Sequence, residues 1–238
     1  MTPALSICIP AHNEARFIGR GLESIWRSAQ NAGQAVEVVV ALNRCTDATQ
    51  SIAESLRARC VVEDTKCIAA VRNASVRASR APAIATLDAD SWLQPHTVAA
   101  ILRKVNDPRW VGGGASIWPE RWSLGIAVTG LIIAPEVLVH GLSGGLFWCQ
   151  REAFEAIGGF DERLVSIEDL DFAKRLKALG RQRGQRFGTL WRQGIYTSCR
   201  KFDTHGDWHL VRNRQLVRRI FTGTDREAAD GYYYDVDR

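Results

Sequence analysis

Short apolar runs alternate with helical patterns over the first ninety positions of the chain. Residues 36–42 form a run rich in valine, which predicts a buried central strand, and residues 5–10 and 83–87 are further apolar runs of strand length. Between these runs, apolar side chains recur at helical spacing over residues 14–32 and 68–78. Strands that alternate with helices pair in parallel and carry helices on both faces. We therefore predict an α/β fold with a Rossmann-like, mostly parallel sheet in a single domain.

The later part of the chain is richer in helical patterns. Residues 95–105 favour a surface helix, and residues 121–140 favour a mostly buried one. Residues 166–179 predict a helix that opens with three acidic residues within four positions, more than a helix start needs. After a polar loop, an amphipathic basic helix is expected to run through Phe221.

Two aspartates, Asp88 and Asp90, directly follow the predicted strand at 83–87. In extended backbone their side chains point the same way, so they can share one hard cation through oxygen ligands. A cation held by two carboxylates keeps coordination positions for substrate phosphates, whereas a solvated turn is the simpler alternative. Because ligands of open α/β sheets bind at the carboxyl ends of strands, the loops after three strands should meet at one rim. Their polar residues are Asn13, Glu14, Asn43, Asp47, Asp88 and Asp90.

Positive charge is concentrated late in the chain. The formal net charge is +5, and residues 181–219 contain ten Lys or Arg against two Asp. This distribution favours an anionic partner, such as nucleic acid, a phosphorylated substrate or an anionic membrane face, with a solvated basic face as the alternative.

Cysteine usage and the longest uncharged run suggest an intracellular protein. The six cysteines form no Cys-x-x-Cys pair, which favours buried free thiols in a reducing compartment, and we expect the cytosol. No basic region precedes the first apolar residues as it would in a secretion signal. The uncharged run at 122–135 is shorter than the roughly 20 apolar residues that span a bilayer.

Six short motifs, in this order and spacing, resemble the successive motifs of family 2 glycosyltransferases with the GT-A fold. The resemblance covers roughly residues 4 to 180. The motifs are Ser6 to Glu14 (SICIPAHNE), Asn43 to Thr49 (NRCTDAT), Val71 to Ala74 (VRNA), Leu87 to Asp90 (LDAD), Gly158 to Glu162 (GGFDE) and Glu168 to Asp171 (EDLD).

The resemblance implies an inverting, metal-dependent transfer of a sugar from a nucleotide diphosphate donor to a hydroxyl acceptor. Asp90 matches the first ligand of Mn²⁺ or Mg²⁺, and Asp88 matches its companion on the ribose or through water. His205 is the candidate for the family's later His, which can complete the metal shell. Asp169 matches the catalytic base, and Glu168 would position the acceptor.

The resemblance also assigns residues to the donor. Many members carry an Asp after the second strand that contacts the uracil edge, whereas this chain has Asn43, whose amide can both accept and donate. The base is therefore open, although a UDP-sugar is favoured. Further donor-side candidates are Pro10, Ala11, Glu14, Lys66 and Arg72 around the nucleotide, Gly145 where backbone can approach a ligand, and Arg200 and Lys201 for the diphosphate.

These assignments predict a glycosyltransferase domain at 1–222, with a nucleotide-sugar-binding half at 1–115, an acceptor-side half at 116–222 and a tail at 223–238. The basic region at 181–219 could rest on the inner face of a membrane to meet a lipid-linked acceptor. Nucleic acid is not expected as a partner.

Three other classes compete with this interpretation. Haloacid-dehalogenase phosphatases also end a strand in Asp-x-Asp, but Trp92 stands where Thr or Val normally follows, and that motif usually lies near the chain start. Sugar-1-phosphate nucleotidyltransferases need a glycine-rich, basic first loop, which residues 11–14 do not supply. A non-catalytic nucleotide-sugar-binding protein remains an alternative.

Overall fold

The computed structural model describes residues 2–140, 145–164 and 167–212, apart from the side chains of 133–140 and 210. Its strands are β1 (Leu5–Ala11), β2 (Val36–Leu42), β3 (Arg59–Val62), β4 (Ala83–Leu87), β5 (Ser91–Leu93), β6 (Trp110–Pro119), β7 (Leu146–Gln150) and β8 (Arg186–Thr197). Its helices are α1 (Ile18–Ala32), α2 (Thr49–Ser55), α3 (Ile68–Ala78), α4 (Thr97–Val105), α5 (Leu124–His140), α6 (Arg151–Ala156), α7 (Glu168–Gln182), α8 (Arg200–His205) and α9 (His209–Arg212).

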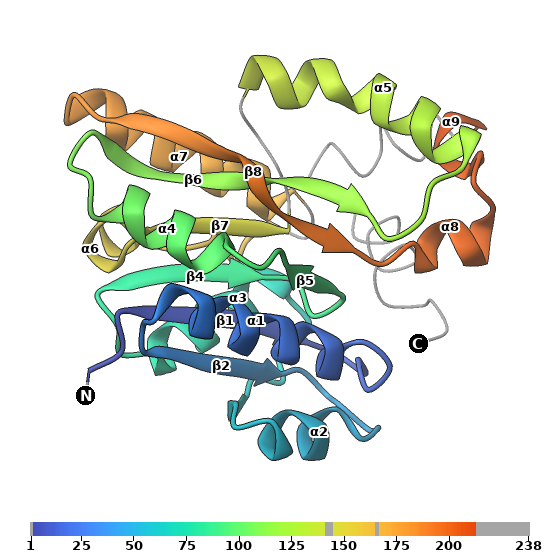
Figure 1. Ribbon diagram of the computed structural model, residues 1–238, viewed down its shortest axis with the longest axis horizontal. Coiled ribbons are helices and arrows are strands. Elements are labelled where there is room, and N and C mark those ends of the chain that lie inside the picture. Colours follow the sequence, from blue (N-terminus) through green and yellow to red (C-terminus); the bar gives the residue numbers. More distant parts are fainter. Residues whose placement is uncertain (1, 141–144, 165–166, 213–238) are drawn as a thin grey trace.

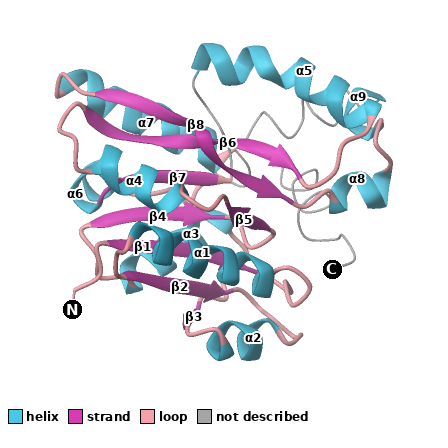
Figure 2. Ribbon diagram, in the orientation of Figure 1, coloured by secondary structure: helices cyan, strands magenta, loops and turns pink. Residues whose placement is uncertain are grey.

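The strands form one sheet in the order β3-β2-β1-β4-β7-β6-β8-β5, which Figure 2 shows in magenta between the helices. The first four neighbours pair in parallel, and Cys8 of β1 lies opposite Val39 of β2 and Thr86 of β4. β7 then pairs antiparallel with β4. The prediction of a single α/β domain with a mostly parallel sheet at its start is confirmed.

Two buried clusters cover the faces of this sheet. One joins α1 and α4 to the strands through Leu22, Ile25 and Ile101, and the other joins α3, α6 and α7 through Val76 and Phe172. Figure 1 shows α1 and α4 in front of the strands. Burial of these apolar faces supplies the main driving force for the fold, at roughly 25 cal/mol per Å² of apolar surface.

Two local predictions differ from the structure, and a third lies largely outside the described residues. The first helix begins at Ile18 rather than 14, because Asn13 has a left-handed backbone (φ 51) and its Oδ1 accepts from the amide of Thr46. Over its described residues 124–132, α5 is not mostly buried, since Leu124 and Leu131 are 72% and 73% exposed. The basic helix expected through Phe221 falls largely outside the described residues. The described part contains α9, which ends at Arg212.

Gly113 of β6 provides a test of the packing between β6, β7 and β8. A Cβ at this position would overlap the carbonyl oxygen of Gly188 and the ring of Trp148. Gly113→Ala should therefore lower the free energy of unfolding by about 3 kcal/mol or more. Gly130→Ala on α5 is the matched control, because a Cβ there meets nothing within 4 Å. It should be neutral or stabilise by about 0.5–1 kcal/mol. Urea denaturation measures both, and equal effects would contradict the packing.

Candidate functional site

Polar residues that follow β1, β2 and β4 gather at one rim of the sheet, as predicted. The Nδ1 atom of His12 lies 2.6 Å from the carbonyl oxygen of Asn43, which connects the first two loops. Arg200, at the start of α8, connects the loop after β1 to the loop after β4 by contacting Glu14 and Asp90. These contacts bring together positions from both ends of the described chain.

A buried arginine links the two groups of acids that the sequence singled out. Arg72 of α3 is 5% exposed, and its Nη2 donates to Asp88 at 2.6 Å while its Nε lies 3.4 Å from Glu168. Burial opposes the charged guanidinium, but Asp88 and Glu168 outweigh burial and raise the pKa of Arg72. In the structure the guanidinium of Arg72 pairs with Asp88, which follows β4, and with Glu168 of α7. The contact of Arg72 with the nucleotide stays a prediction.

The two acids at the start of α7 have environments that suit proton transfer. Burial, with a smaller contribution from Asp169, raises the pKa of Glu168 to about 7. Burial also raises the pKa of Asp169, although Arg72 opposes the shift. A carboxylate whose pKa approaches neutrality is a more effective general base at pH 7 than an ordinary one. The pair can therefore accept a proton.

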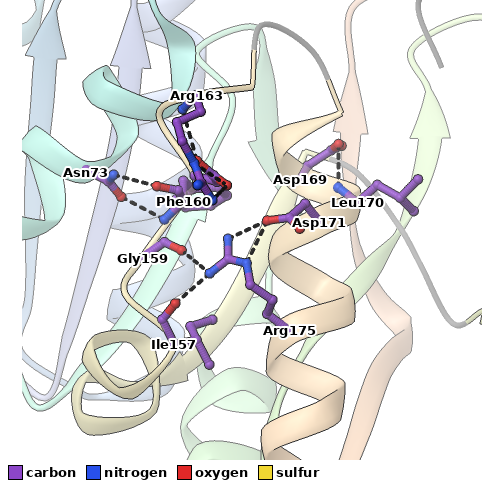
Figure 3. Close-up of polar contacts among 10 residues, drawn as sticks. Asn73, Ile157, Gly159, Phe160, Arg163, Asp169, Leu170, Asp171 and Arg175 are labelled. Atoms are coloured by element: carbon purple, nitrogen blue, oxygen red, sulfur yellow. Dashed lines mark hydrogen bonds and ion pairs between the residues drawn. The ribbon is translucent and has the colours of Figure 1, made fainter. Parts of the chain in front are cut away.

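The backbone that presents these acids is strained and firmly held. Ile167 has a left-handed conformation (φ 57), which is costly for a β-branched residue and is typical of functional positions. Figure 3 shows Arg175 between Asp171 and the carbonyl groups of Ile157 and Gly159. Asp171 thus has a structural role, as the partner of Arg175 at 2.6 Å.

Asn73 is a positioning residue that sequence reasoning missed. Its amide donates to the carbonyl oxygen of Phe160 and accepts from the amide of Phe160, both at 2.9 Å, as in Figure 3. It also donates to Glu162 at 2.8 Å. The amide thereby fixes the 158–162 turn against α3, next to Arg72. The adjacency of Arg72 and Asn73 in one motif was the available signal.

Asp90 is held by two residues that follow β8. Its Oδ2 accepts from Ser198 Oγ at 2.8 Å and lies 3.2 Å from Arg200 Nε. Arg200 Nη1 donates to Glu14 Oε2 at 2.8 Å, and Glu14 is 4% exposed. Arg200 therefore contacts two carboxylates, and its assignment to the diphosphate stays a prediction. Lys201 follows it on α8 and is half-buried.

Asn43, which directly follows β2, is the residue predicted to contact the nucleotide base. Its Nδ2 donates to the carbonyl oxygens of Glu63 and Thr65, at 2.6 and 2.9 Å. Its Oδ1 is buried and has no partner within the described part of the chain. Pro10 and Ala11 are buried at the end of β1, and Lys66 is exposed before α3. Among the described residues, the structure thus leaves one unpartnered amide acceptor at the end of β2.

Gly145 occupies a position that favours glycine. It has φ +78, and its carbonyl oxygen accepts from the amide of Asp88 at 3.0 Å. A Cβ on Gly145 would lie 3.0 Å from Ile195 and 3.5 Å from Asp88 Oδ2. The glycine therefore brings the backbone close to the acid pair, and its approach to a ligand stays a prediction.

The acid pair has the chemistry of a site for Mg²⁺ or Mn²⁺. Both ions prefer carboxylate oxygens and complete their shells with water and substrate phosphates, so two aspartates suit a cation shared with a diphosphate. Across the described ranges, no group of three or more His, Cys, Asp or Glu side chains could hold a metal. His205 is exposed on α8 and stacks on His209, with ring centroids 4.6 Å apart. The structure does not group it with the aspartates.

Comparison with known proteins agrees with this geometry. The family model of glycosyl transferase family 2 matches residues 6–158. EpsH of Bacillus subtilis (strain 168), named as a glycosyltransferase, is 28% identical over 111 residues, covering 44% of this chain. The match is 31% of EpsH, so the chain spans about a third of that relative.

Solved structures show the fold. PcManGT, a mannosyltransferase from Pyrobaculum calidifontis in complex with GDP-Man and Mn²⁺, has a TM-score of 0.70 at 18% identity, covering 96% of this chain and 64% of that one. S. aureus TarS in complex with UDP-GlcNAc has a TM-score of 0.63 at 16% identity, covering 99% and 71%. These likenesses establish a GT-A architecture. Together with the family model, which matches well over half of the sequence, they show that the chain belongs to glycosyl transferase family 2.

Proposed function

We propose that this chain is an inverting, metal-dependent glycosyltransferase that moves a sugar from a nucleotide diphosphate donor to a hydroxyl acceptor. The observation that carries the proposal is the contact of one buried guanidinium, Arg72, with both acid groups. It holds Asp88, on the donor side, beside the start of α7, on the acceptor side. A donor held at β4 and an acceptor held at α7 would then meet between them.

In this proposal, Asp169 takes the proton of the acceptor hydroxyl as that oxygen bonds to the anomeric carbon. The bond from that carbon to the diphosphate oxygen breaks, and its electron pair leaves with the nucleoside diphosphate. A cation held by Asp88 and Asp90 would stabilise the negative charge of the leaving diphosphate. Glu168 positions the acceptor. Attack opposite the leaving group, with one base, inverts the configuration.

The donor base is proposed to be uracil. Because both hydrogens of the Asn43 amide are engaged by backbone carbonyls, its Oδ1 is left to accept from an N–H of the base. Uracil, thymine and guanine present such an N–H, whereas the equivalent ring nitrogens of cytosine and adenine are acceptors. PcManGT with GDP-Man and TarS with UDP-GlcNAc fall within the permitted group. The phosphatase alternative loses its support, since the chain belongs to a transferase family.

We further propose peripheral contact with the inner face of an anionic membrane, where a lipid-linked acceptor would lie. The outward stripe of α5 is apolar, with Leu124 and Leu131 among the most exposed side chains and Trp122 63% exposed beside them. Arg212 ends the α9 helix, which packs on α5, and three more arginines follow in the sequence within 214–219. In the described part of the chain, no helix has the length and apolar character to cross a bilayer.

Nucleotide titration tests the donor. UDP should raise the melting temperature most when Mn²⁺ is present, GDP and dTDP should raise it less, and CDP and ADP should raise it least, because only their exocyclic amines can donate to Asn43 Oδ1. Asp90→Ala should remove most of the Mn²⁺-dependent part of the shift. A response to CDP equal to that of UDP would refute the role of Asn43, and no response to any nucleotide would favour a different function.

Asp169→Asn tests the base. The substitution keeps the size of the side chain but cannot accept the proton, so hydrolysis or transfer of the UDP-sugar should fall by at least about 100-fold. UDP binding, measured by calorimetry, should stay within about twofold of the unaltered protein. Asp107→Asn, on the α4–β6 loop, is the surface control and should retain full activity. Substantial activity in Asp169→Asn would require another base.

Flotation with liposomes tests the membrane contact. At low salt the protein should float with vesicles that contain anionic phospholipid, and Leu131→Glu should reduce the bound fraction because it places a charge on the apolar stripe. Val62→Glu, at an apolar side chain of similar exposure on β3, should float normally. Absence of binding to anionic vesicles would rule the contact out.

A further inference from the structure

The guanidinium of Arg200 is placed between two carboxylates, one of which belongs to the acid pair. Its side chain is 17% exposed and contacts two carboxylates, Asp90 at 3.2 Å and Glu14 at 2.8 Å. The guanidinium also lies 5.5 Å from the centre of the Phe17 ring. Arg200 is therefore held from three sides, at the end of the sheet where the acid pair lies.

The charges around Asp90 leave little attraction for a second cation. Asp90 and Glu14 together contribute two negative charges, and Arg200 neutralises one of them. The Oδ2 atom of Asp90 is already shared by Arg200 and Ser198. On the other side, Asp88 is neutralised by Arg72. A divalent ion that binds Asp90 must share the carboxylate with a guanidinium, and like charges at such separations repel strongly where water is scarce.

We propose that Arg200 competes with the divalent cation for Asp90 and so keeps the affinity for the free ion low until a diphosphate binds. The inference rests on the proposed function, since it concerns the same cation. A nucleoside diphosphate adds two or more negative charges beside the acid pair. Arg200 can then donate to phosphate oxygens, and the cation can take its share of Asp90. Ion and nucleotide would bind cooperatively, because each removes the obstacle to the other.

A simpler role for Arg200 makes the opposite prediction. If Arg200 only fixed the rotamer of Asp90 or bound the diphosphate, its removal would weaken the binding of the free ion or leave it unchanged. If Arg200 competes with the ion, its removal must tighten that binding. The sign of the change distinguishes the two roles.

The experiment measures binding of Mn²⁺ alone, from the loss of the free-ion signal in electron paramagnetic resonance, with no nucleotide present. Arg200→Gln should bind Mn²⁺ at least about tenfold more tightly than the unaltered protein. Arg200→Lys keeps the charge and should stay close to the unaltered protein. Arg212→Gln removes an equal charge from α9 and serves as the control, with no change expected.

An Arg200→Gln affinity equal to or weaker than that of the unaltered protein would overturn the proposal, and so would the absence of Mn²⁺ binding in that variant. A second measurement uses the unaltered protein, so that it does not depend on how the variant folds. After correction for chelation by the nucleotide, UDP should tighten Mn²⁺ binding by at least about tenfold, and no tightening would also overturn the proposal. A failure of UDP, GDP and dTDP to bind at all, seen in the separate titration, would instead reject the proposed function.

Discussion

The buried guanidinium of Arg72 is the interaction on which the candidate site depends. Its side chain lies on α3, between the end of β4 and the start of α7, and it pairs with an acid from each. Removing this arginine would leave Glu168, whose side chain is 10% exposed, without its cation in a poorly hydrated region, a change that typically costs several kcal/mol. The positions of Asp88 and Glu168 therefore depend on each other, because both carboxylates pair with Arg72.

Much of the fold followed from the sequence because its signals were local. The valine-rich run of β2 and the apolar run of β4 predict buried strands regardless of what surrounds them. The rim was equally accessible, since polar residues after parallel strands meet at one edge. Local signals were misleading for the helix at 121–140. Its sequence is apolar, but an apolar sequence does not show whether the outer face of a helix is covered. Leu131 is exposed although nothing in its neighbours along the chain distinguishes it from a core residue.

The partners of the site residues could not be predicted in this way. Arg72 was assigned to the nucleotide and Arg200 to the diphosphate, which is where cations are expected in a phosphate-binding protein. Each also contacts carboxylates contributed by distant segments, which the sequence did not indicate, because those pairings depend on side-chain reach across the finished fold. Asn73 illustrates the same limit, since its amide replaces backbone partners for Phe160, a role that no local pattern reveals.

The pairing of Glu14 with Arg200 also has a consequence for how the chain is made. The two residues are 186 positions apart, so a ribosome completes β1 and its loop long before the guanidinium that pairs with Glu14 emerges. The nucleotide-side strands can assemble early, since their contacts are near one another in sequence, but the rim acquires its full set of charges last. During synthesis Glu14 would thus lack its ion pair with Arg200 until the ribosome has translated α8.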